Sequence, residues 1–300
     1  MKKYSVRPAT IRDIEAVYAL IAAQNLNDFG DANISLDGLH RRWQKILFEK
    51  QTCMAYADGE LEGYAELRDG DSPFIYLADK NNIDLGFQLL MVLEDFAKDN
   101  KVVELSTQIS ARNQTLLELF LLNGYHSNLS FLIMELMMTE PPAAPEWEEG
   151  IQVRSFVPGQ DEQATFRADE EVAEDKGYHE PLDFDGWSKR MGLGSERFDP
   201  GLWFLACGGN EIAGVALNYH DRRTDTGWVD HLGVRRAWRK KGIGRALLLH
   251  TFREFYRRGV KHVKLSVDSK SLTNAPHLYE SVGMTTIHEY HIYRKELPVQ

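Results

Sequence analysis

The sequence predicts an α/β (α+β) protein of two tandem domains, each a central mixed β-sheet flanked by helices. Three observations support this prediction. The 300 residues suit two domains of average size. The two halves carry strand and helix patterns in the same order. A polar stretch rich in proline and glutamate, TEPPAAPEWEEG at 139–150, lies between them and is typical of a linker.

Three matched segments indicate the duplication. They are SVRPATIRDIEAVYAL (5–20) with QVRSFVPGQDEQATFRA (152–168), DGELEGYAEL (58–67) with GNEIAGVALN (209–218), and LELFLLNGY (117–125) with APHLYESVGM (275–284). Each match is weak by itself, but all three occur in the same order. We therefore predict domains at 1–140 and 151–300, joined by a linker at 141–150.

Local patterns predict the elements of the second half in turn. Apolar runs bounded by turn residues predict strands at 151–155, 202–207, 212–219, 228–234, 261–267 and 286–294. Helical periodicity predicts helices within 159–192 and at 243–258 and 273–281. The helix from 243 has apolar residues at Leu247, Leu248, Thr251, Phe252 and Phe255, and Gly259 is a natural stop. The dipeptides Asp58-Gly59 and Gly209-Asn210 predict a hairpin turn in each half.

Composition excludes several classes of function. The net charge of −10 argues against a general binder of nucleic acid or of membrane surfaces. Two cysteines, Cys53 and Cys207, do not form a disulfide framework, and both are expected to be buried apolar residues. The sequence contains no HExxH or Cys/His ligand spacing, so no metal is expected. With neither a signal peptide nor a membrane span apparent, we expect a cytoplasmic protein.

The segment at a strand-to-helix turn in the second half indicates a site for a diphosphate. It reads Arg239, Lys240, Lys241, Gly242, Ile243, Gly244, Arg245, and is strongly cationic in an acidic protein. Unpaired N–H groups and the helix dipole favour an anion at a helix N-terminus, and glycine permits close approach of the backbone. Arginine and lysine add charge-assisted hydrogen bonds.

Other phosphate-binding loops fit this segment less well. A P-loop requires GxxxxGK[ST], which is absent. A dinucleotide fingerprint would need a third glycine at the position of Leu247, and its turn is far less basic. Plain helix capping by the two glycines remains the simplest alternative.

Two motifs in order resemble the GNAT superfamily of N-acetyltransferases over roughly 151–300. The spacing of Arg239, Gly242 and Gly244 is similar to that family's [Q/R]-x-x-G-x-[G/A] signature. VDSKSLTNAPHLYESVGM (267–284) is similar to its following strand and helix, which end in A-x-x-L-Y-x-x-x-G-[F/M]. The resemblance implies GNAT-like domains, acetyl-CoA as co-substrate and direct transfer in a ternary complex.

The resemblance also implies roles for individual residues. The cofactor pyrophosphate would lie on 239–245, and its pantetheine arm along Leu232, Gly233 and Val234, where the Leu232 N–H could polarise the thioester carbonyl. The family often has asparagine about eight positions before its tyrosine. Ser271 occupies that place here, with Asn274 nearby, and either could hydrogen-bond the cofactor.

Tyr279 matches the family position that often serves as general acid, and the alternative is an aromatic ring that only packs. For the general base we favour Asp230 on the preceding strand, although the adjacent His231 belongs to a residue type that titrates near neutral pH. Strand alternation predicts that these two side chains lie on opposite faces of the sheet.

The first half resembles the same family in scaffold but lacks the loop. Its corresponding turn has one glycine, Gly86, and one cation, Lys80, before the helix, and Phe120 replaces the tyrosine. We predict that this half is inactive and supports the other, a layout similar to that of the mycothiol synthases.

The predicted activity is acetyl transfer to a primary amine of a small molecule. The region 161–187 is rich in Asp and Glu and would favour a cationic amine, with Tyr178, His179 and Trp187 as candidate lining residues. Alternatives are a non-catalytic protein that binds or senses acyl-CoA, a hydroxyl acceptor and a longer acyl group. A monomer or homodimer is expected.

Overall fold

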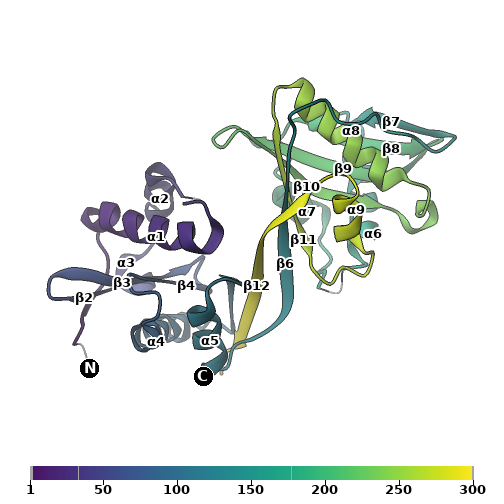
Figure 1. Cartoon of the computed structure of the whole chain (residues 1–300). Coiled ribbons are helices and arrows are strands. Elements are labelled where there is room, and N and C mark those ends of the chain that lie inside the picture. The colour runs from purple at the N-terminus through teal and green to yellow at the C-terminus, as the bar shows by residue number, and fades with distance from the viewer. Residues whose placement is uncertain (1–2, 33, 177, 299–300) are drawn as a thin grey trace. The chain divides into compact units, whose positions relative to one another are not determined.

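The protein is represented by a computed structural model that describes residues 3–32, 34–176 and 178–298 (Figure 1). The chain divides into two compact units. Unit 1 comprises Met1–Phe131 together with His288–Gln300, and unit 2 comprises Leu132–Ile287.

Unit 1 alternates strands and helices as the sequence predicts. Its elements are β1 (Ser5–Arg7), η1 (Ile11–Asp13), α1 (Ile14–Phe29), α2 (Leu36–Trp43), α3 (Phe48–Gln51), β2 (Thr52–Ala57), β3 (Glu60–Arg68), β4 (Ser72–Leu77), α4 (Ile83–Asp99), β5 (Glu104–Ser110) and α5 (Gln114–Leu122). Strands β6 (His126–Met137) and β12 (Thr285–Glu296) each have residues in both units.

Unit 2 repeats the same plan, and its elements match the predicted ranges closely. They are β7 (Ile151–Ser155), α6 (Glu162–Ala173), α7 (Phe184–Met191), η2 (Pro200–Leu202), β8 (Trp203–Gly208), β9 (Glu211–Asp221), β10 (Thr226–Val234), η3 (Arg236–Trp238), α8 (Ile243–Arg257), β11 (His262–Asp268) and α9 (Ala275–Glu280). The predicted linker between β6 and β7 contains no helix or strand.

The strand order shows that the final strand of each half pairs with the other half of the sequence. One sheet has the order β1-β2-β3-β4, and the other has the order β5-β12-β6-β11-β10-β9-β8-β7. Within unit 1, Tyr290–Glu296 of β12 pairs antiparallel with β5. Within unit 2, β6 lies beside β11. The division into units therefore differs from the predicted boundaries at 1–140 and 151–300, because two similar halves offer equivalent sheet edges and local patterns do not specify which edge a strand joins.

In unit 1, helices cover both faces of the first four strands (Figure 1). Leu89 and Leu93 of α4 pack against Ala55 and Leu67, whereas Val17 of α1 packs with Met54 on the opposite face. Neighbouring residues of β2 therefore point to opposite sides, as strand geometry requires. Cys53 is buried as predicted, whereas Cys207 in unit 2 is half-buried, and both thiols are free.

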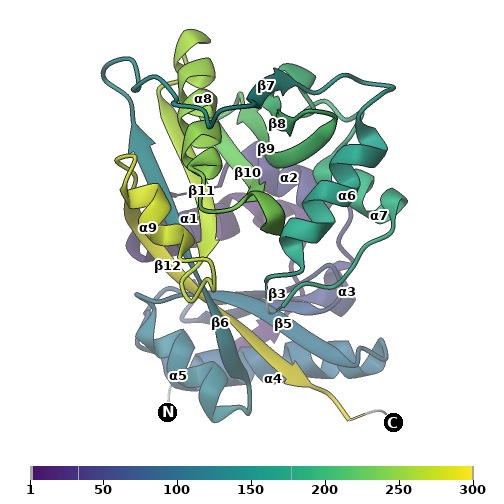
Figure 2. The same ribbon diagram turned by 90° about the vertical axis from the view of Figure 1, so that its right-hand side faces the viewer.

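In unit 2, α8 covers one face of the sheet, and α6 and α7 cover the other (Figure 2). The predicted apolar stripe of α8 is confirmed, because Leu247, Leu248, Phe252 and Phe255 are all buried. On the other face, Trp187 of α7 packs against Trp203. Full burial of side chains of this kind contributes roughly 1.5–3 kcal/mol each.

Equivalent contacts in the two units support the duplication. Arg7 forms a two-pronged ion pair with Asp13, and Arg154 forms the same pair with Asp161. Each pair fastens the first strand to the start of the first helix. The predicted two-residue turns are also present, because Ala57 pairs with Glu60 and Gly208 pairs with Glu211.

Candidate functional site

The two central parallel strands of unit 2 separate part-way along their length. β10 and β11 pair only from Thr226 and His262 to Val229 and Leu265. β10 then continues to Val234 while its other edge still pairs with β9. Within the described residues, no strand pairs with the β10 edge that faces β11 from Asp230 onward, so its backbone groups are available to an extended ligand, apart from the Val234 carbonyl, which accepts a hydrogen bond from Arg239. Leu232, Gly233 and Val234 all lie on this part of the strand.

A β-bulge at Asp230 marks the point where the strands separate. Val229 pairs with Asn218 of β9 and His231 pairs with Leu217, so Asp230 is the extra residue. Asp230 lies 3.8 Å from Arg197, while His231 contacts Asp169 of α6.

The predicted alternation of Asp230 and His231 is therefore wrong. Val229 and Leu232 pack on the α8 side, whereas both Asp230 and His231 face the side of α6 and α7. The inserted residue shifts the strand register by one, so two consecutive side chains share a face.

The basic loop leads directly into α8. Gly242 is the N-cap residue, with φ at 74°, and no side chain caps the helix. The first intrahelical bond along the helix is donated by the Ala246 N–H to the Gly242 carbonyl. The N–H groups of Ile243, Gly244 and Arg245 thus have no hydrogen-bond partner in the described part of the chain, which is the arrangement that binds anions at helix N-termini.

The cations of the loop divide into two groups. The Arg239 guanidinium donates to the Val234 carbonyl at 2.9 Å and forms an ion pair with Asp175, so it fastens the loop to β10 and to the end of α6. Lys240, Lys241 and Arg245 are exposed and form no ion pair among the described residues. Their charges therefore remain available to an anion, whereas the charge of Arg239 is already compensated.

Gly233 allows α6 to approach β10 closely. A Cβ atom at this position would lie 2.0 Å from Cγ1 of Val172, and valine has no rotamer freedom to spare at its branched Cβ. We expect Gly233→Ala to lower the free energy of unfolding by roughly 1–3 kcal/mol through overpacking. Urea unfolding measures this loss. Val172→Ala in the same chain should recover most of it, and an unchanged midpoint in the single variant would contradict the close approach.

Tyr279 lies on α9 and is almost completely buried, with its ring packed in the same core cluster as Val267 of β11 and Phe252 of α8. Burial raises the pKa of Tyr279 to about 12, and the nearby Tyr178 hydroxyl adds to the rise. The phenol therefore remains protonated at neutral pH. Ser271 and Asn274 lie in the turn before α9, where the Ser271 hydroxyl contacts Thr273, and Asn274 is the N-cap residue with φ at 57°.

Four carboxylates of 161–187, including Asp161, Glu171 and Asp175, are paired with arginines. Asp161 binds Arg154, Glu171 binds Arg235, and Asp175 binds Arg236. The contact with Arg236 is the main cause that lowers the pKa of Asp175. The region therefore offers a cationic acceptor much less negative charge than its sequence suggests.

The three candidate lining residues of this region have different environments. Trp187 is buried and packs in the core, so it lines no open cavity. His179 contacts Glu170 at 3.1 Å. Tyr178 is half-buried and lies close enough to Tyr279 for their hydroxyl groups to interact electrostatically.

Comparisons with known proteins identify the family of this chain. A model of the acetyltransferase (GNAT) family matches residues 162–284. A crystal structure of a GCN5-related N-acetyltransferase from Sphaerobacter thermophilus is similar with a TM-score of 0.82 and 34% sequence identity, and the alignment covers 98% of this chain and 95% of that one. The chain belongs to the GCN5-related N-acetyltransferase family.

Other members of the GNAT family are also similar. A mycothiol acetyltransferase of Thermobispora bispora is 32% identical over 161 residues, which cover 51% of this chain and 52% of that protein. The chain thus spans about half the length of the first curated relatives it matches. A tandem GNAT protein from the clavulanic acid biosynthesis pathway shares the fold, with a TM-score of 0.70, 12% identity, and coverage of 99% of this chain and 100% of that one.

The corresponding GNAT helix of unit 1 begins differently. Asn82 caps α4, because its side chain accepts a hydrogen bond from the Leu85 N–H at 3.1 Å. A donor that is open in α8 is thus already occupied in α4. Phe120, at the position of Tyr279, is buried and has no hydroxyl to donate.

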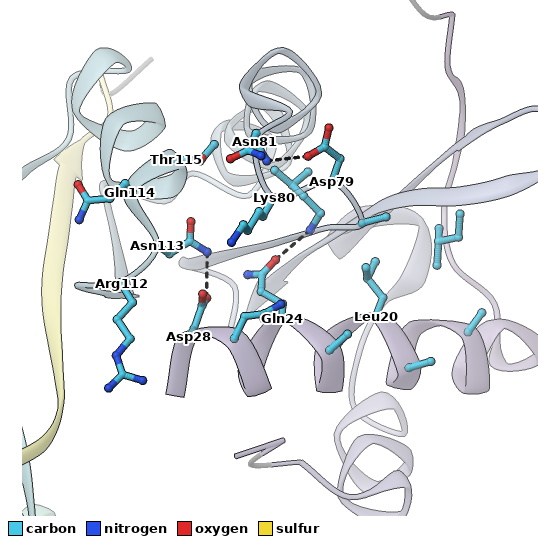
Figure 3. A pocket seen from close by; sticks show the side chains of 17 residues that line it. Leu20, Gln24, Asp28, Asp79, Lys80, Asn81, Arg112, Asn113, Gln114 and Thr115 are labelled. Carbon is cyan, nitrogen blue, oxygen red and sulfur yellow. Dashed lines mark hydrogen bonds between the residues drawn. The ribbon is translucent and has the colours of Figure 1, made fainter. Parts of the chain in front are cut away.

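Unit 1 nevertheless retains a cavity of about 930 Å³ beside the ends of β4 and β5, lined on one side by α1 (Figure 3). Asn113 spans part of it and donates to Asp28 at 2.9 Å, as Figure 3 shows. The cations Lys80 and Arg112 line the cavity together with the carboxylates Asp28 and Asp79. Its lining is therefore of mixed charge, unlike the basic loop of unit 2.

Among the described residues, no helix is both long enough and apolar enough to cross a membrane. Within the same part of the chain, no three His, Cys, Asp or Glu side chains group as metal ligands would.

Proposed function

We propose that this protein transfers the acetyl group of acetyl-CoA to a primary amine of a small molecule, and that unit 2 carries the site. The observation that carries the proposal is the open N-terminus of α8 next to the unpaired end of β10. The helix supplies N–H donors and exposed cations for a pyrophosphate, and the strand supplies backbone groups for the amides of a pantetheine arm.

The proposed cofactor contacts follow the loop and the strand. The pyrophosphate binds the backbone of the loop 239–245, with charge from Lys240, Lys241 and Arg245. The pantetheine extends along Leu232, Gly233 and Val234. Ser271 and Asn274 lie in the turn before α9 and are candidates for a hydrogen bond to the cofactor.

The proposed chemistry is direct attack by a neutral amine on the thioester carbon. The N–C bond forms, the C–S bond breaks, and the thiolate leaves. The Leu232 N–H stabilises the oxyanion that develops on the carbonyl oxygen. Tyr279, whose raised pKa keeps the phenol protonated before transfer, donates its proton to the departing thiolate, and the phenolate then takes up the proton that the attacking nitrogen loses on becoming an amide.

The capped start of α4 and the missing hydroxyl at Phe120 favour a first half that supports the second half and is itself inactive. Calorimetric titration of acetyl-CoA into the whole chain tests both statements, because it counts sites. We expect one site per chain, followed by acetylation of members of an amine panel. Two sites would contradict the supporting role of the first half, and no binding would refute the transferase. Binding without acetylation of any amine would favour an acyl-CoA sensor.

A further inference from the structure

A buried carboxylate joins α6 to the strand of the proposed site. Asp169 is 2% exposed. It accepts a hydrogen bond from the Trp187 indole N–H at 2.8 Å, and the Nδ1 atom of His231 lies 3.0 and 2.8 Å from its two oxygens. Burial alone would raise the pKa of Asp169, but its contacts with His231 and Trp187 outweigh burial and lower that pKa. Asp169 is therefore an ionised acceptor.

An ionised acceptor determines which nitrogen of His231 carries the proton. A carboxylate has no hydrogen to donate, so the bond to Nδ1 requires a proton on Nδ1. In the neutral imidazole, Nε2 then carries the lone pair. The His231 side chain is 16% exposed, and its Nε2 atom has no hydrogen-bond partner among the described residues. The Trp187 bond in turn holds the carboxylate in place, and Trp187 itself is locked in the core.

The surroundings of His231 connect it to the other proposed groups. It is adjacent to Leu232, whose N–H would meet the thioester carbonyl. Lys176, in the turn after α6, interacts electrostatically with both Asp169 and Asp230, and burial lowers the pKa of this lysine. The same turn carries Tyr178, which interacts with Tyr279. The turn after α6 thus lies near both the Asp169–His231 pair and the proposed general acid, Tyr279.

The charged groups around this face of β10 are few. On the strand itself, the side chain of Asp230 lies 3.8 Å from Arg197. α6 and the turn after it contribute Asp169, Glu170 and Lys176. α7 contributes Arg190, whose positive charge lowers the pKa of Lys176.

We infer that His231 is the group that takes the proton from the acceptor ammonium, and that Asp169 is its positioning residue. This inference rests on the proposed function. In the step, an N–H bond of the ammonium breaks and a bond from the proton to Nε2 forms, which leaves a neutral amine and an imidazolium. The Asp169 carboxylate offsets the new positive charge. After transfer, the imidazolium returns the proton to solvent.

The geometry favours His231 over Asp230 for this step. The Asp230 carboxylate is exposed and has Arg197 as its partner, so nothing buried fixes its orientation. His231 is held on one side by the Asp169 carboxylate, which is buried and ionised and also accepts a hydrogen bond from Trp187. That arrangement also explains why an α6 residue, far away in the sequence, is aimed at β10.

The test measures both the tautomer of His231 and the rate of turnover in the intact chain. Nitrogen-15 NMR of labelled histidines, assigned with His231→Gln, reports which ring nitrogen of His231 is protonated without any substrate. Turnover is measured on an amine that the wild type acetylates, and acetyl-CoA affinity by calorimetry. Asp169→Asn keeps the size of the side chain but offers an amide hydrogen to Nδ1, which should move the proton to Nε2. Asp230→Asn tests the competing candidate base on the same face of the strand.

We expect an Nδ1–H tautomer in the wild type and an Nε2–H tautomer in Asp169→Asn. His231→Gln and Asp169→Asn should each lower kcat by about 100-fold with acetyl-CoA affinity unchanged, since general base catalysis contributes ~10²–10⁴-fold. The fall in kcat/KM of the wild type toward acidic pH should be absent in His231→Gln. Asp230→Asn removes the competing candidate base and should lower kcat far less than His231→Gln, because the loss of the general base itself costs ~10²-fold or more.

An Nε2–H tautomer in the wild type would overturn this inference but leave the proposed function standing. Normal turnover by His231→Gln would do the same. A 100-fold loss in Asp230→Asn with none in His231→Gln would assign the role to Asp230 instead. Failure of the wild type to bind acetyl-CoA would overturn the proposed function, and that result is read separately from the tautomer. Thermal unfolding of each variant shows whether a loss of turnover arises from a loss of folded protein.

Discussion

Replacing Gly242 with glutamate should abolish binding of acetyl-CoA. The new carboxylate would lie at the start of α8, where the proposed pyrophosphate meets the open N–H groups. Apposed like charges cost several kcal/mol, and such a cost weakens binding by ~100-fold or more. Isothermal titration of acetyl-CoA into the variant measures this loss.

Three further variants separate charge from shape. Gly242 has φ at 74° and no atom within 4 Å of a Cβ atom there, so Gly242→Ala adds strain of only roughly 1–2 kcal/mol and no clash. Gly242→Gln adds bulk without charge. Gly259→Glu is the matched control, because that glycine also has a positive φ and open surroundings but lies at the far end of α8, ~25 Å away.

We expect Gly259→Glu to bind normally, Gly242→Ala to bind within about 10-fold of wild type because the strain is small, and Gly242→Gln to fall between alanine and glutamate. Normal binding by Gly242→Glu would refute the assignment of the loop to the pyrophosphate. Equal losses in Gly242→Ala and Gly242→Glu would attribute the effect to backbone strain rather than to charge.

Tyr279→Phe should lower kcat by about 100-fold, in the range of general acid catalysis, and leave acetyl-CoA affinity nearly unchanged. The variant removes the hydroxyl but keeps the ring that packs against α8 and β11. The raised pKa of Tyr279, about 12, keeps the phenol protonated at neutral pH, as the proposed general acid requires. Steady-state kinetics on an acetylated amine measure kcat, and calorimetry measures affinity.

Tyr293→Phe provides the control for Tyr279→Phe. Tyr293 is a second buried tyrosine, packed in the core of unit 1, and burial raises its pKa as well. Removal of the Tyr293 hydroxyl in Tyr293→Phe should leave kcat unchanged. If Tyr279→Phe retained full turnover, the residue would be a packing aromatic only, which is the alternative that its burial also permits.

Much of the proposed cofactor site can be predicted from sequence because its determinants are local. The apolar spacing of Leu247, Leu248 and Phe252 predicts α8, and the cluster of cations with Gly242 and Gly244 predicts an anion site at its start. Local patterns cannot reveal that Arg239 is already paired, because its partner Asp175 lies on a different element.

The acceptor side of the proposed site is predicted less accurately by the sequence. The carboxylates of 161–187 read as an acidic surface, yet each ion pair they form depends on a strand or loop that folding brings near. The bulge at Asp230 also has no local signature, and it puts His231 on the same face as Asp230 instead of the opposite one. Asp169 gives no signal in its helix, since its partners, Trp187 and His231, are distant in sequence.

The sequence by itself determined the duplicated plan, the order of strands and helices, and the basic glycine loop, because periodicity, turn residues and charge act between near neighbours. Only the tertiary structure decided which sheet β6 and β12 join, where β10 and β11 separate, and which nitrogen of His231 contacts Asp169. These features depend on contacts between residues far apart in the chain, and their free energies exist only once the core has brought those residues together.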